Sequence, residues 1–457
     1  MKQAVQKQKL DMLNGPLWNK IPQFALPVAA TAILEQLFNA SDIAVVGNFS
    51  GAASTIAVAA VGANSFVISL VVNFFIGIAL GANVVIANAI GREDTDAVHR
   101  AVHTAVVVAV LGGVLVTVLG ELAAGPALRA LNVPAEVLPY ALLYLRIYLL
   151  GVPVILLYNF EAAIFRSVGD TRVPLQTLAF SGVLNVLLNL FFVIVLHMTV
   201  NGVATATVLS NAISSVLLFV RLRRSDKAIH LEWAALRIDR RSLQKILQIG
   251  IPAGIQSAVF SISNIVIQSA INSLGTVVMA ASSAAFNIEV VAYDVLNSFS
   301  QACTTFVGQN YGAGKLDRCR KTLVLCLVED ALASGIAILL VLGSGHFLLS
   351  LFNRDPEVIA LGYTRLMTVF TAYFFSMLYE VMSGYLRGFG ISLVPALLTM
   401  LGVCGVRILW IATAFPRSRT FQTILLAYPL SLAATAVLIL LALLIYHPSR
   451  RMKGEAV

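Results

Sequence analysis

Long apolar stretches, separated by short polar turns, run through almost the whole chain. Each stretch has about 20 or more residues, the length that an α-helix needs to cross the hydrocarbon core of a bilayer. The pattern predicts twelve transmembrane helices, near residues 21–46, 53–88, 98–121, 137–162, 173–196, 202–221, 246–271, 276–307, 321–345, 357–384, 393–415 and 420–446. We therefore expect an all-α integral membrane protein.

The second half of the chain repeats the first at a shift of 221 positions. The segment Phe165–Pro174 returns as Leu386–Pro395, and an arginine, a glycine and a proline keep the same spacing in both copies. Because each half holds an even number of spans, both halves enter the membrane from the same side. The internal repeat is thus parallel, and we expect two six-helix lobes.

The same pattern divides the chain into five parts. They are a polar N-terminal segment (1–20), an N-lobe (21–221), a basic linker (222–245), a C-lobe (246–446) and a short tail (447–457). If the N-terminus is cytoplasmic, 24 of the 31 Lys and Arg residues fall in cytoplasmic segments. This bias predicts a multi-pass protein of the cell (inner) membrane with both termini in the cytoplasm. The linker is expected to face anionic lipid headgroups rather than nucleic acid.

Composition and motifs exclude several classes of protein. Hydrophobic residues make up 59% of the chain and charged residues 12%, whereas soluble domains carry about 25% charged residues. The four cysteines and six histidines lack metal-site or disulfide spacing, and no phosphate-binding loop occurs. We expect no cofactor, no enzymatic activity and a monomer. If the protein is a transporter, it must draw its energy from an ion gradient or from the gradient of its substrate.

Acidic residues within the first span point to an ion site. A carboxylate at the centre of a membrane helix costs about 2.5–3.5 kcal/mol, so such residues usually have a function. Glu35 and Asp42 lie seven residues apart, on one face of a helix, and their span carries no cation. We predict that these two residues bind a coupling ion or a proton.

Polar and aromatic residues of the seventh and eighth spans form a predicted substrate surface. Asp294 lies on a polar face near the middle of its span, and Asn264 and Gln268 belong to a neutral polar stripe. The rings of Phe260 and Tyr293 are close by in the sequence, and aromatic faces attract organic cations. These five residues are the predicted substrate ligands.

Other charges within the spans have a structural interpretation. Glu380 lies within two turns of Arg387, so an ion pair between them is expected, and Arg407 is a second candidate partner for Glu380. Arg365 is expected to snorkel or to pair near the outer leaflet.

Taken together, the motifs of this chain resemble those of the multidrug and toxic compound extrusion (MATE) family. They are the two Arg-x-x-Gly-x-x-x-x-Pro elements and the segments Ser41–Gly47, Gly202–Thr207 and Gln309–Lys315. The resemblance covers nearly the whole chain. It implies a V-shaped pair of lobes that rocks between inward and outward openings. It also implies a secondary active antiporter for multidrug efflux, which exports cationic, amphipathic compounds, antibiotics and other xenobiotics among them, in exchange for H⁺ or Na⁺.

The resemblance also assigns the residues of a cation site. The family's aspartate in span 1 matches Asp42, its asparagine in span 5 matches Asn185, and its threonine in span 6 matches Thr207. Many relatives carry a carboxylate where this chain has Asn189, and this exchange lowers the negative charge of the site. Na⁺ at Asp42 is the only metal expected, and coupling by a proton at Glu35 and Asp42 is preferred.

Three alternatives remain open from the sequence. A flippase of a lipid-linked precursor, or an exporter of a specific metabolite such as a nucleotide or flavin, would need buried cations for an anionic substrate. Acids outnumber arginines within the spans, which argues against both. A membrane scaffold or receptor has no need of acids on buried helix faces.

Overall fold

The computed structural model describes residues 10–131, 133–225 and 228–448. These residues form helices and turns without a strand, and twelve of the helical segments are long and apolar enough to cross a membrane. The predicted count of spans is thus confirmed. The described part of the chain divides into two compact units, the first containing the residues from Ala30 to Gly250 and the second containing Leu10–Ala29 with the residues from Ile251 on.

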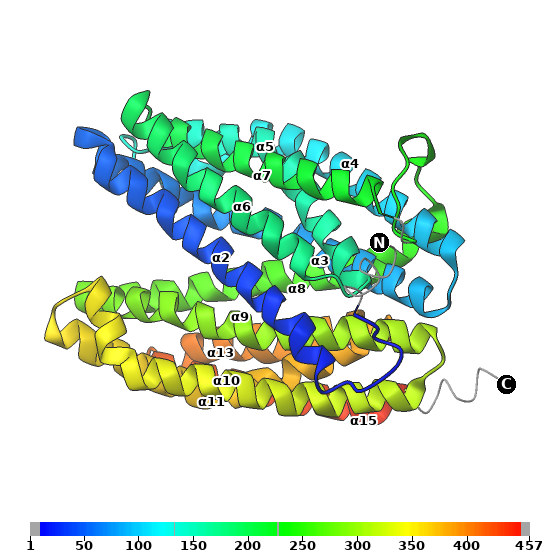
Figure 1. The fold of residues 1–457 in the computed structure, drawn as a ribbon. Helices are drawn as coiled ribbons and strands as arrows, with labels where there is room; N and C mark the ends of the chain where they lie inside the picture. The colour runs from blue at the N-terminus through cyan, green and yellow to red at the C-terminus, as the bar shows by residue number, and fades with distance from the viewer. Residues whose placement is uncertain (1–9, 132, 226–227, 449–457) are drawn as a thin grey trace. The chain divides into compact units, whose positions relative to one another are not determined.

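The first unit is a bundle of long helices, which Figure 1 shows in blue to green. They are α2 (Lys20–Phe49, from Ala30 on), α3 (Ser54–Gly91), α4 (Thr95–Ala130), α5 (Leu138–Ser167), α6 (Arg172–Leu190) and α7 (Val200–Arg223). Three short elements join them, namely η2 (Gly51–Ala53), the π-turn η3 (Phe191–Val195) and η4 (Trp233–Ala235).

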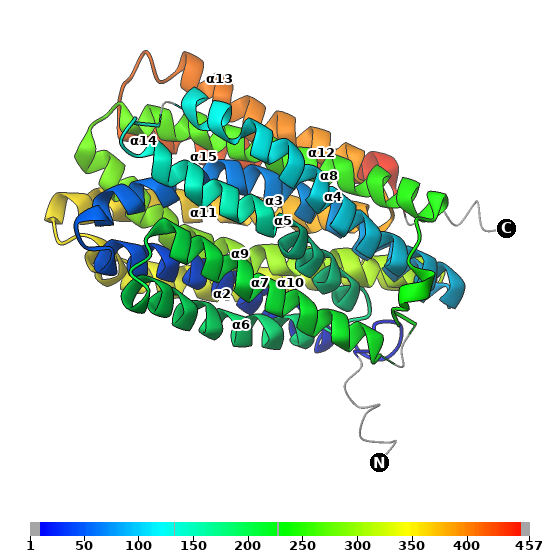
Figure 2. The same cartoon turned by 90° about the horizontal axis from the view of Figure 1, so that it is seen from above.

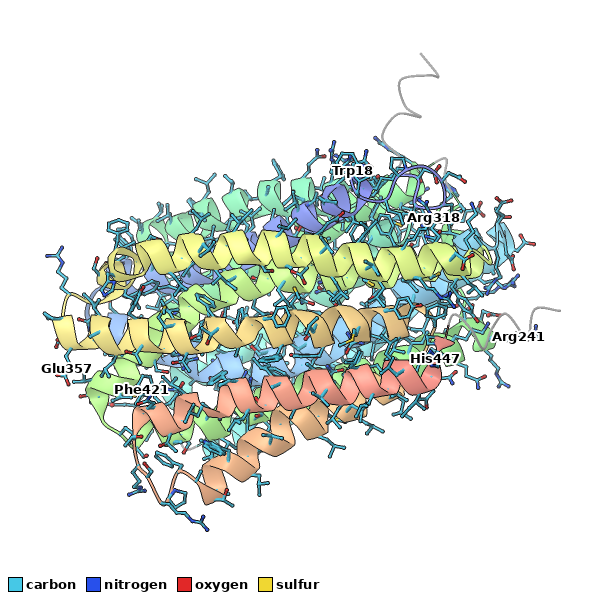
Figure 3. The ribbon with its side chains drawn as sticks, turned by 90° about the horizontal axis from the view of Figure 1, so that it is seen from below. Trp18, Arg241, Arg318, Glu357, Phe421 and His447 are labelled. Atoms are coloured by element: carbon cyan, nitrogen blue, oxygen red, sulfur yellow. The ribbon has the colours of Figure 1, made fainter. Side chains whose placement is uncertain are left out.

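The second unit contains most of α8 (Arg240–Asn272) and all of the helices that follow. They are α9 (Thr276–Gly312), α10 (Leu316–Phe352), α11 (Pro356–Gly388), α12 (Leu393–Thr399), α13 (Val406–Thr413), α14 (Phe421–Leu425) and α15 (Ala427–Tyr446). The π-turn η5 (Met400–Gly405) joins α12 to α13, so the three elements form one continuous helical path (Figure 2). Glu357 and Phe421 lie at one end of this unit, and Arg318 and His447 lie at the other (Figure 3).

The edges of the two units differ from those of the predicted lobes. The hydropathy pattern assigns all of α2 to an N-lobe at 21–221, whereas its first turns belong to the second unit, where Phe24 packs edge-on against Phe306. The first turns of α8 belong to the first unit, where Ile246 and Ile249 join the hydrophobic core. Hydropathy reports that a segment is buried, not which neighbours bury it, so this exchange is visible only in the structure.

The repeated sequence motif builds the same helix end twice. Gly169 and Gly390 follow α5 and α11 with φ values of 81° and 83°, a left-handed conformation that glycine adopts without strain. Each glycine N–H donates to the carbonyl three residues earlier, and the next N–H donates to the carbonyl five residues earlier. This pattern is a Schellman cap, which explains the Arg-x-x-Gly spacing.

A contact between helices also repeats at the shift of 221 positions. In the first unit the side-chain amide of Asn83 donates to the carbonyl oxygen of Ala163 at 3.1 Å. In the second unit the hydroxyl of Thr304 donates to the carbonyl oxygen of Gly384, also at 3.1 Å. Both bonds join the second helix of a unit to its fourth, so the duplication extends to tertiary contacts.

The basic linker packs on the first unit. Ile229 and Leu231 are buried in its hydrophobic core. The main-chain N–H of Asp239 donates to Thr104 Oγ1 at 3.0 Å, and the main-chain N–H and hydroxyl of Ser242 donate to the Asp239 carboxylate. The bonds from Ser242 hold the pKa of Asp239 below its ordinary value. This end of α8 is therefore capped and anchored on α4.

Candidate functional site

The carboxylate of Asp42 lies at the centre of a hydrogen-bonded cluster in the first unit. The side-chain amide of Asn189 donates to Asp42 Oδ1 at 2.6 Å, and the hydroxyl of Thr207 donates to Asp42 Oδ2 at 2.9 Å. The same amide group donates to Asn185 Oδ1 at 3.1 Å, and Asn185 donates to Ser210 Oγ at 3.4 Å. Helices α2, α6 and α7 thus bring together four of the residues predicted from the sequence.

Burial and neutral partners define the chemistry of this cluster. Asp42 is 5% exposed and Asn189 is fully buried. Both hydrogen-bond partners of Asp42 are uncharged, and among the described residues no cation forms an ion pair with it. Asn189 Oδ1 is buried and accepts no hydrogen bond from the described part of the chain. The cluster therefore offers one uncompensated carboxylate and one further oxygen acceptor.

Glu35 lies on the same helix but outside this cluster. Within the described ranges no hydrogen bond joins Glu35 to Asp42 or to the partners of Asp42. The structure therefore does not join Glu35 to the hydrogen-bonded cluster of Asp42, with which the sequence pairs it. Seven residues, about two helical turns, separate the two acids along α2 (Lys20–Phe49).

The predicted substrate residues of the second unit fall into separate contacts. Tyr293 donates its hydroxyl to Glu380 Oε1 at 3.0 Å. Gln268 donates to Asn272 on its own helix at 2.8 Å. Asp294 is half-buried on α9. These residues line two helices of one unit, but the structure does not join them into one hydrogen-bonded site.

Asn264 and Phe260 instead contact a buried arginine. Nη1 of Arg407 donates to Asn264 Oδ1 at 3.5 Å, and its Nε donates to Ser431 Oγ at 3.0 Å. The guanidinium lies over the ring of Phe260 at 5.4 Å and over that of Tyr428 at 4.5 Å. The Phe260 ring thus stacks on a cation of the protein itself.

A second buried arginine in this unit is neutralised. Nε and Nη2 of Arg365 donate to the two oxygens of Glu289 at 2.7 and 2.9 Å. Ser282 and Tyr428 accept further bonds from the same guanidinium. A bidentate pair of this kind fixes both charge and orientation. Of the two sequence expectations for Arg365, snorkelling or pairing, the structure shows pairing.

Comparison with known proteins now decides the family. The MatE family model matches residues 27–191 and again residues 252–412, which together are more than half of the chain. This chain belongs to the MatE family. The double match confirms the internal repeat, and the fold class of two lobes is confirmed with it.

The individual MATE relatives agree. The chain is 25% identical over 401 residues to the "Probable multidrug resistance protein YoeA" of Bacillus subtilis, with 86% of each protein covered. It is 26% identical over 254 residues to the "FAD transporter" of Shewanella oneidensis, covering 53% of this chain and 55% of that protein. A solved structure, "Crystal structure of MATE in the bent conformation", matches with a TM-score of 0.88 at 19% identity, covering 97% of this chain and 99% of that one.

The family assignment makes this MATE chain a multi-pass membrane transporter, since its relatives are transporters and not enzymes. In this MATE chain Arg407 is the functional candidate that sequence reasoning missed. The sequence suggests Glu380 as its partner, but no carboxylate lies within ion-pair distance of Arg407 among the described residues. The expected pair of Glu380 with Arg387 is also absent there, because Tyr293 binds Glu380 and Gln256 accepts from Arg387 at 2.8 Å.

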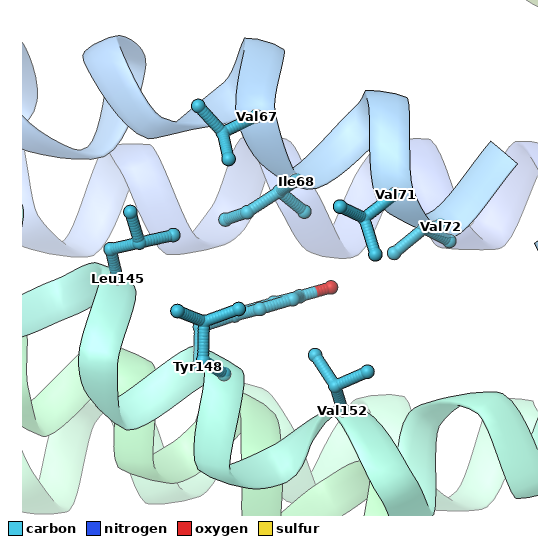
Figure 4. Close-up of a pocket in the computed structure, with 8 residues that line it drawn as sticks. Val67, Ile68, Val71, Val72, Leu145, Tyr148 and Val152 are labelled. Carbon is cyan, nitrogen blue, oxygen red and sulfur yellow. The ribbon is translucent and has the colours of Figure 1, made fainter. Parts of the chain in front are cut away.

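The first unit of this MATE chain also holds an apolar pocket between α3 and α5 (Figure 4). Val71 and Val152 are among its walls, and the ring of Tyr148 extends into the space between the two helices.

Proposed function

We propose that this MATE transporter is a secondary active antiporter that exports cationic, amphipathic compounds in exchange for H⁺ or Na⁺ by alternating access of its two lobes. The coupling ion binds at Asp42, with Asn185, Asn189 and Thr207 as supporting ligands. The protein lies in the cell (inner) membrane as a monomer with both termini in the cytoplasm.

The observation that carries this proposal is the buried, uncompensated carboxylate of Asp42. An ionised carboxylate that is 5% exposed has lost most of its hydration, and two neutral hydrogen bonds replace only part of it. A proton or a sodium ion removes the net charge. Occupied and empty states of the cluster therefore differ in energy, and such a difference is what an ion gradient needs in order to drive a conformational cycle.

Helix α2 connects this cluster to the second unit. Asp42 lies in the part of α2 that belongs to the first unit, and Pro27 lies in the part that belongs to the second. Proline lacks an N–H and clashes with the preceding turn, so it weakens the helix locally. We propose that Pro27 acts as the hinge through which the charge state of Asp42 changes the course of α2.

A proton is the preferred coupling ion. The cluster has one acid, which a single proton neutralises, whereas Na⁺ requires several oxygen ligands. Asn189 supplies an amide where many relatives have a second carboxylate, which lowers the attraction for a metal cation. The unpartnered Oδ1 of Asn189 is the oxygen through which a sodium ion would gain its second ligand.

The proposal is tested with purified protein in liposomes that contain a fluorescent organic cation. Release is followed under an imposed pH gradient and, separately, under an imposed Na⁺ gradient. We expect acceleration by the pH gradient and loss of that acceleration in Asp42→Asn. The matched control is Glu136→Gln, which removes an exposed acid of the same unit and is expected to leave coupling intact.

Two outcomes would contradict the proposal. Release that ignores both gradients would exclude antiport of organic cations. Coupling that survives in Asp42→Asn at a normal level of folded protein would move the ion site elsewhere, with Glu35 tested next through Glu35→Gln.

For substrate contact we propose Asp294, Gln268, Asn264, Phe260 and Tyr293, all in the second unit. A second candidate function, export of a specific metabolite, is supported by the similarity to a protein described as an FAD transporter. It is also supported by the buried arginine at Arg407, since an anionic metabolite needs a cationic ligand. Release of a flavin nucleotide from the same liposomes distinguishes the two functions.

A further inference from the structure

Arg407 is a buried cation without a buried anion beside it. Its side chain is 3% exposed, and its hydrogen-bond partners, Ser431 and Asn264, are neutral. Within the described ranges Nη2 donates no hydrogen bond, and no carboxylate lies within 4.0 Å of the guanidinium. Burial of a charge without a counter-ion is unfavourable and rare in proteins. The site therefore has the charge and the free donor that an anionic ligand requires.

The same unit contains a second buried arginine, Arg365, whose charge is neutralised by a carboxylate. Arg365 donates hydrogen bonds to both carboxylate oxygens of Glu289. Tyr428 lies between the two arginines, with its ring 5.3 Å from the guanidinium carbon of Arg365 and 4.5 Å from that of Arg407. Aromatic faces stabilise a cation without cancelling its charge. Arg407 thus remains available for an anion, and Arg365 does not.

The internal repeat relates Arg407 to the ion cluster of the first unit. At the shift of 221 positions, Ser431 corresponds to Ser210 and Tyr428 to Thr207. In the first unit Ser210 accepts from Asn185, and in the second Ser431 accepts from Arg407.

Asn185, which binds Ser210, and Arg407, which binds Ser431, are separated by one position more than the repeat shift of 221, and a π-turn explains this difference. Asn185 would correspond to residue 406, but η5 (Met400–Gly405) precedes it in the second unit. A π-turn accommodates one residue more than an α-turn and often occurs at functional sites. Arg407 therefore takes the place of Asn185, and the two units present related sites with opposite charge at their centres.

The counterpart of α2 supports the reversal of charge. Counted from Pro27 and Pro252, Glu35 corresponds to Phe260 and Asp42 to Ile267. Where the first unit has acids, the second has apolar residues, so nothing at those positions competes with an anion for Arg407.

We propose that the second unit binds the carboxylate group of an aromatic or amphipathic compound at Arg407. The guanidinium binds the carboxylate, while Asn264 and Ser431 hold the guanidinium in place. The rings of Phe260 and Tyr428 form flat apolar walls for the rest of the ligand. This proposal rests on the proposed function for the conclusion that the protein exports its substrates. It extends the substrate class from simple cations to zwitterions and carboxylates.

Binding is tested without any gradient, so that its failure is separate from a failure of antiport. Three compounds with one ring and different charge, namely benzoate, benzamide and benzylamine, are titrated into detergent-solubilised protein. Trp410 lies about one helical turn from Arg407 in the sequence. The double variant Trp18→Phe with Trp233→Phe leaves Trp410 as the remaining tryptophan of the chain. Its fluorescence reports binding. We expect saturable binding of benzoate at least tenfold tighter than that of benzamide or benzylamine.

Variants identify the ligand. Arg407→Gln is expected to weaken benzoate binding at least tenfold, and Arg407→Lys is expected to restore part of it. Arg354→Gln removes an exposed positive charge from the same unit and is expected to leave binding unchanged. If Arg407→Gln fails to fold, Ser431→Ala and Asn264→Ala, which leave the charge in place but misalign it, are each expected to weaken benzoate binding severalfold. Equal affinity for benzoate and benzamide would overturn the proposal. Unchanged affinity for benzoate in Arg407→Gln, Ser431→Ala and Asn264→Ala would overturn it as well.

Discussion

Asn189 holds the carboxylate of Asp42 from 147 positions away in the sequence, with its amide nitrogen 2.6 Å from Oδ1. The other oxygen, Oδ2, accepts from Thr207, so each oxygen of this buried acid has one neutral donor. The acid is positioned but not neutralised. Several consequences of this arrangement and of the surrounding fold can be measured.

Thr207→Val tests the donor to Asp42. The hydroxyl bond favours the ionised carboxylate, so its loss makes the acid retain its proton to higher pH. A bond to a charged group contributes about 1.5–3 kcal/mol, so we expect the pH of half-maximal efflux to rise by about 1–2 units. Thr205→Val is the matched control, because the Thr205 hydroxyl donates to the carbonyl oxygen of Asn201 on its own helix and to no other group in the described part of the chain. Equal shifts in both variants would argue against the role of Thr207.

Glu289→Gln tests the buried pair with Arg365. Removal of one partner leaves the guanidinium buried and uncompensated, which costs about 3–5 kcal/mol. We expect a loss of that order in the free energy of unfolding, measured by denaturant titration in detergent. The double variant Glu289→Leu with Arg365→Met removes both charges and is expected to recover most of the loss. A double variant no more stable than Glu289→Gln would show that the pair itself, and not the orphaned charge, dominates.

Arg318 tests how the segment before α2 is held on the second unit. Its guanidinium donates to the carbonyl oxygens of Met12, Asn14 and Gly15 at 3.2, 3.1 and 2.8 Å. Lysine cannot reproduce this fork of donors, so in Arg318→Lys we expect amide hydrogen exchange in residues 10–17 to be about tenfold faster, the effect of losing roughly 1.4 kcal/mol of local stability.

Arg320→Lys is the control for that measurement. Arg320 forms an exposed pair with Asp317 at 3.9 Å, and such pairs contribute little. Unchanged exchange at residues 10–17 in Arg318→Lys would mean that Lys315 and Asn310, which also bond to this segment, suffice to hold it.

Gly81→Ala tests the close approach of α3 to the start of α8. An added Cβ would lie 2.3 Å from the carbonyl oxygen of Ile246 and 2.8 Å from the main-chain nitrogen of Gly250. Both contacts are with backbone, which cannot rotate away, so we expect destabilisation of about 1–3 kcal/mol and reduced transport. Gly62→Ala on the same helix meets open space and is the control. Thermal unfolding in detergent checks both, and equal midpoints would contradict this packing.

The sequence predicted the parts of the fold that depend on local composition. Twelve apolar runs could only be twelve spans, because an unpaired backbone group in lipid is so unfavourable that a helix is the available solution. The repeated Arg-x-x-Gly element predicted a duplicated unit, and its glycines form the same cap twice. The sequence also singled out Asp42, since an acid without a cation in its span stands out from its apolar surroundings.

The sequence was a poorer guide to pairing. It suggested Arg387 or Arg407 for Glu380, where the structure has Tyr293, and it named no partner for Arg365, which the structure joins to Glu289. Helical spacing tells which residues share a face but not which face of another helix they meet. The partner of a charge within a bundle is therefore set by packing.

The hydropathy pattern and the repeat, read from the sequence by itself, determined that this chain is a duplicated, twelve-span membrane protein. They also showed that its first span carries an acid, Asp42, within an apolar helix. Only the tertiary structure decided which oxygen of that acid Asn189 and Thr207 each bind. It also decided that Arg407 has no carboxylate within 4.0 Å among the described residues, and that the first turns of α2 and α8 are exchanged between the units. The physical reason is one of range. The burial of apolar groups and backbone hydrogen bonding act along each helix and are written in its own residues. Hydrogen bonds and ion pairs between helices act over about 3 Å and depend on the packing of the whole unit.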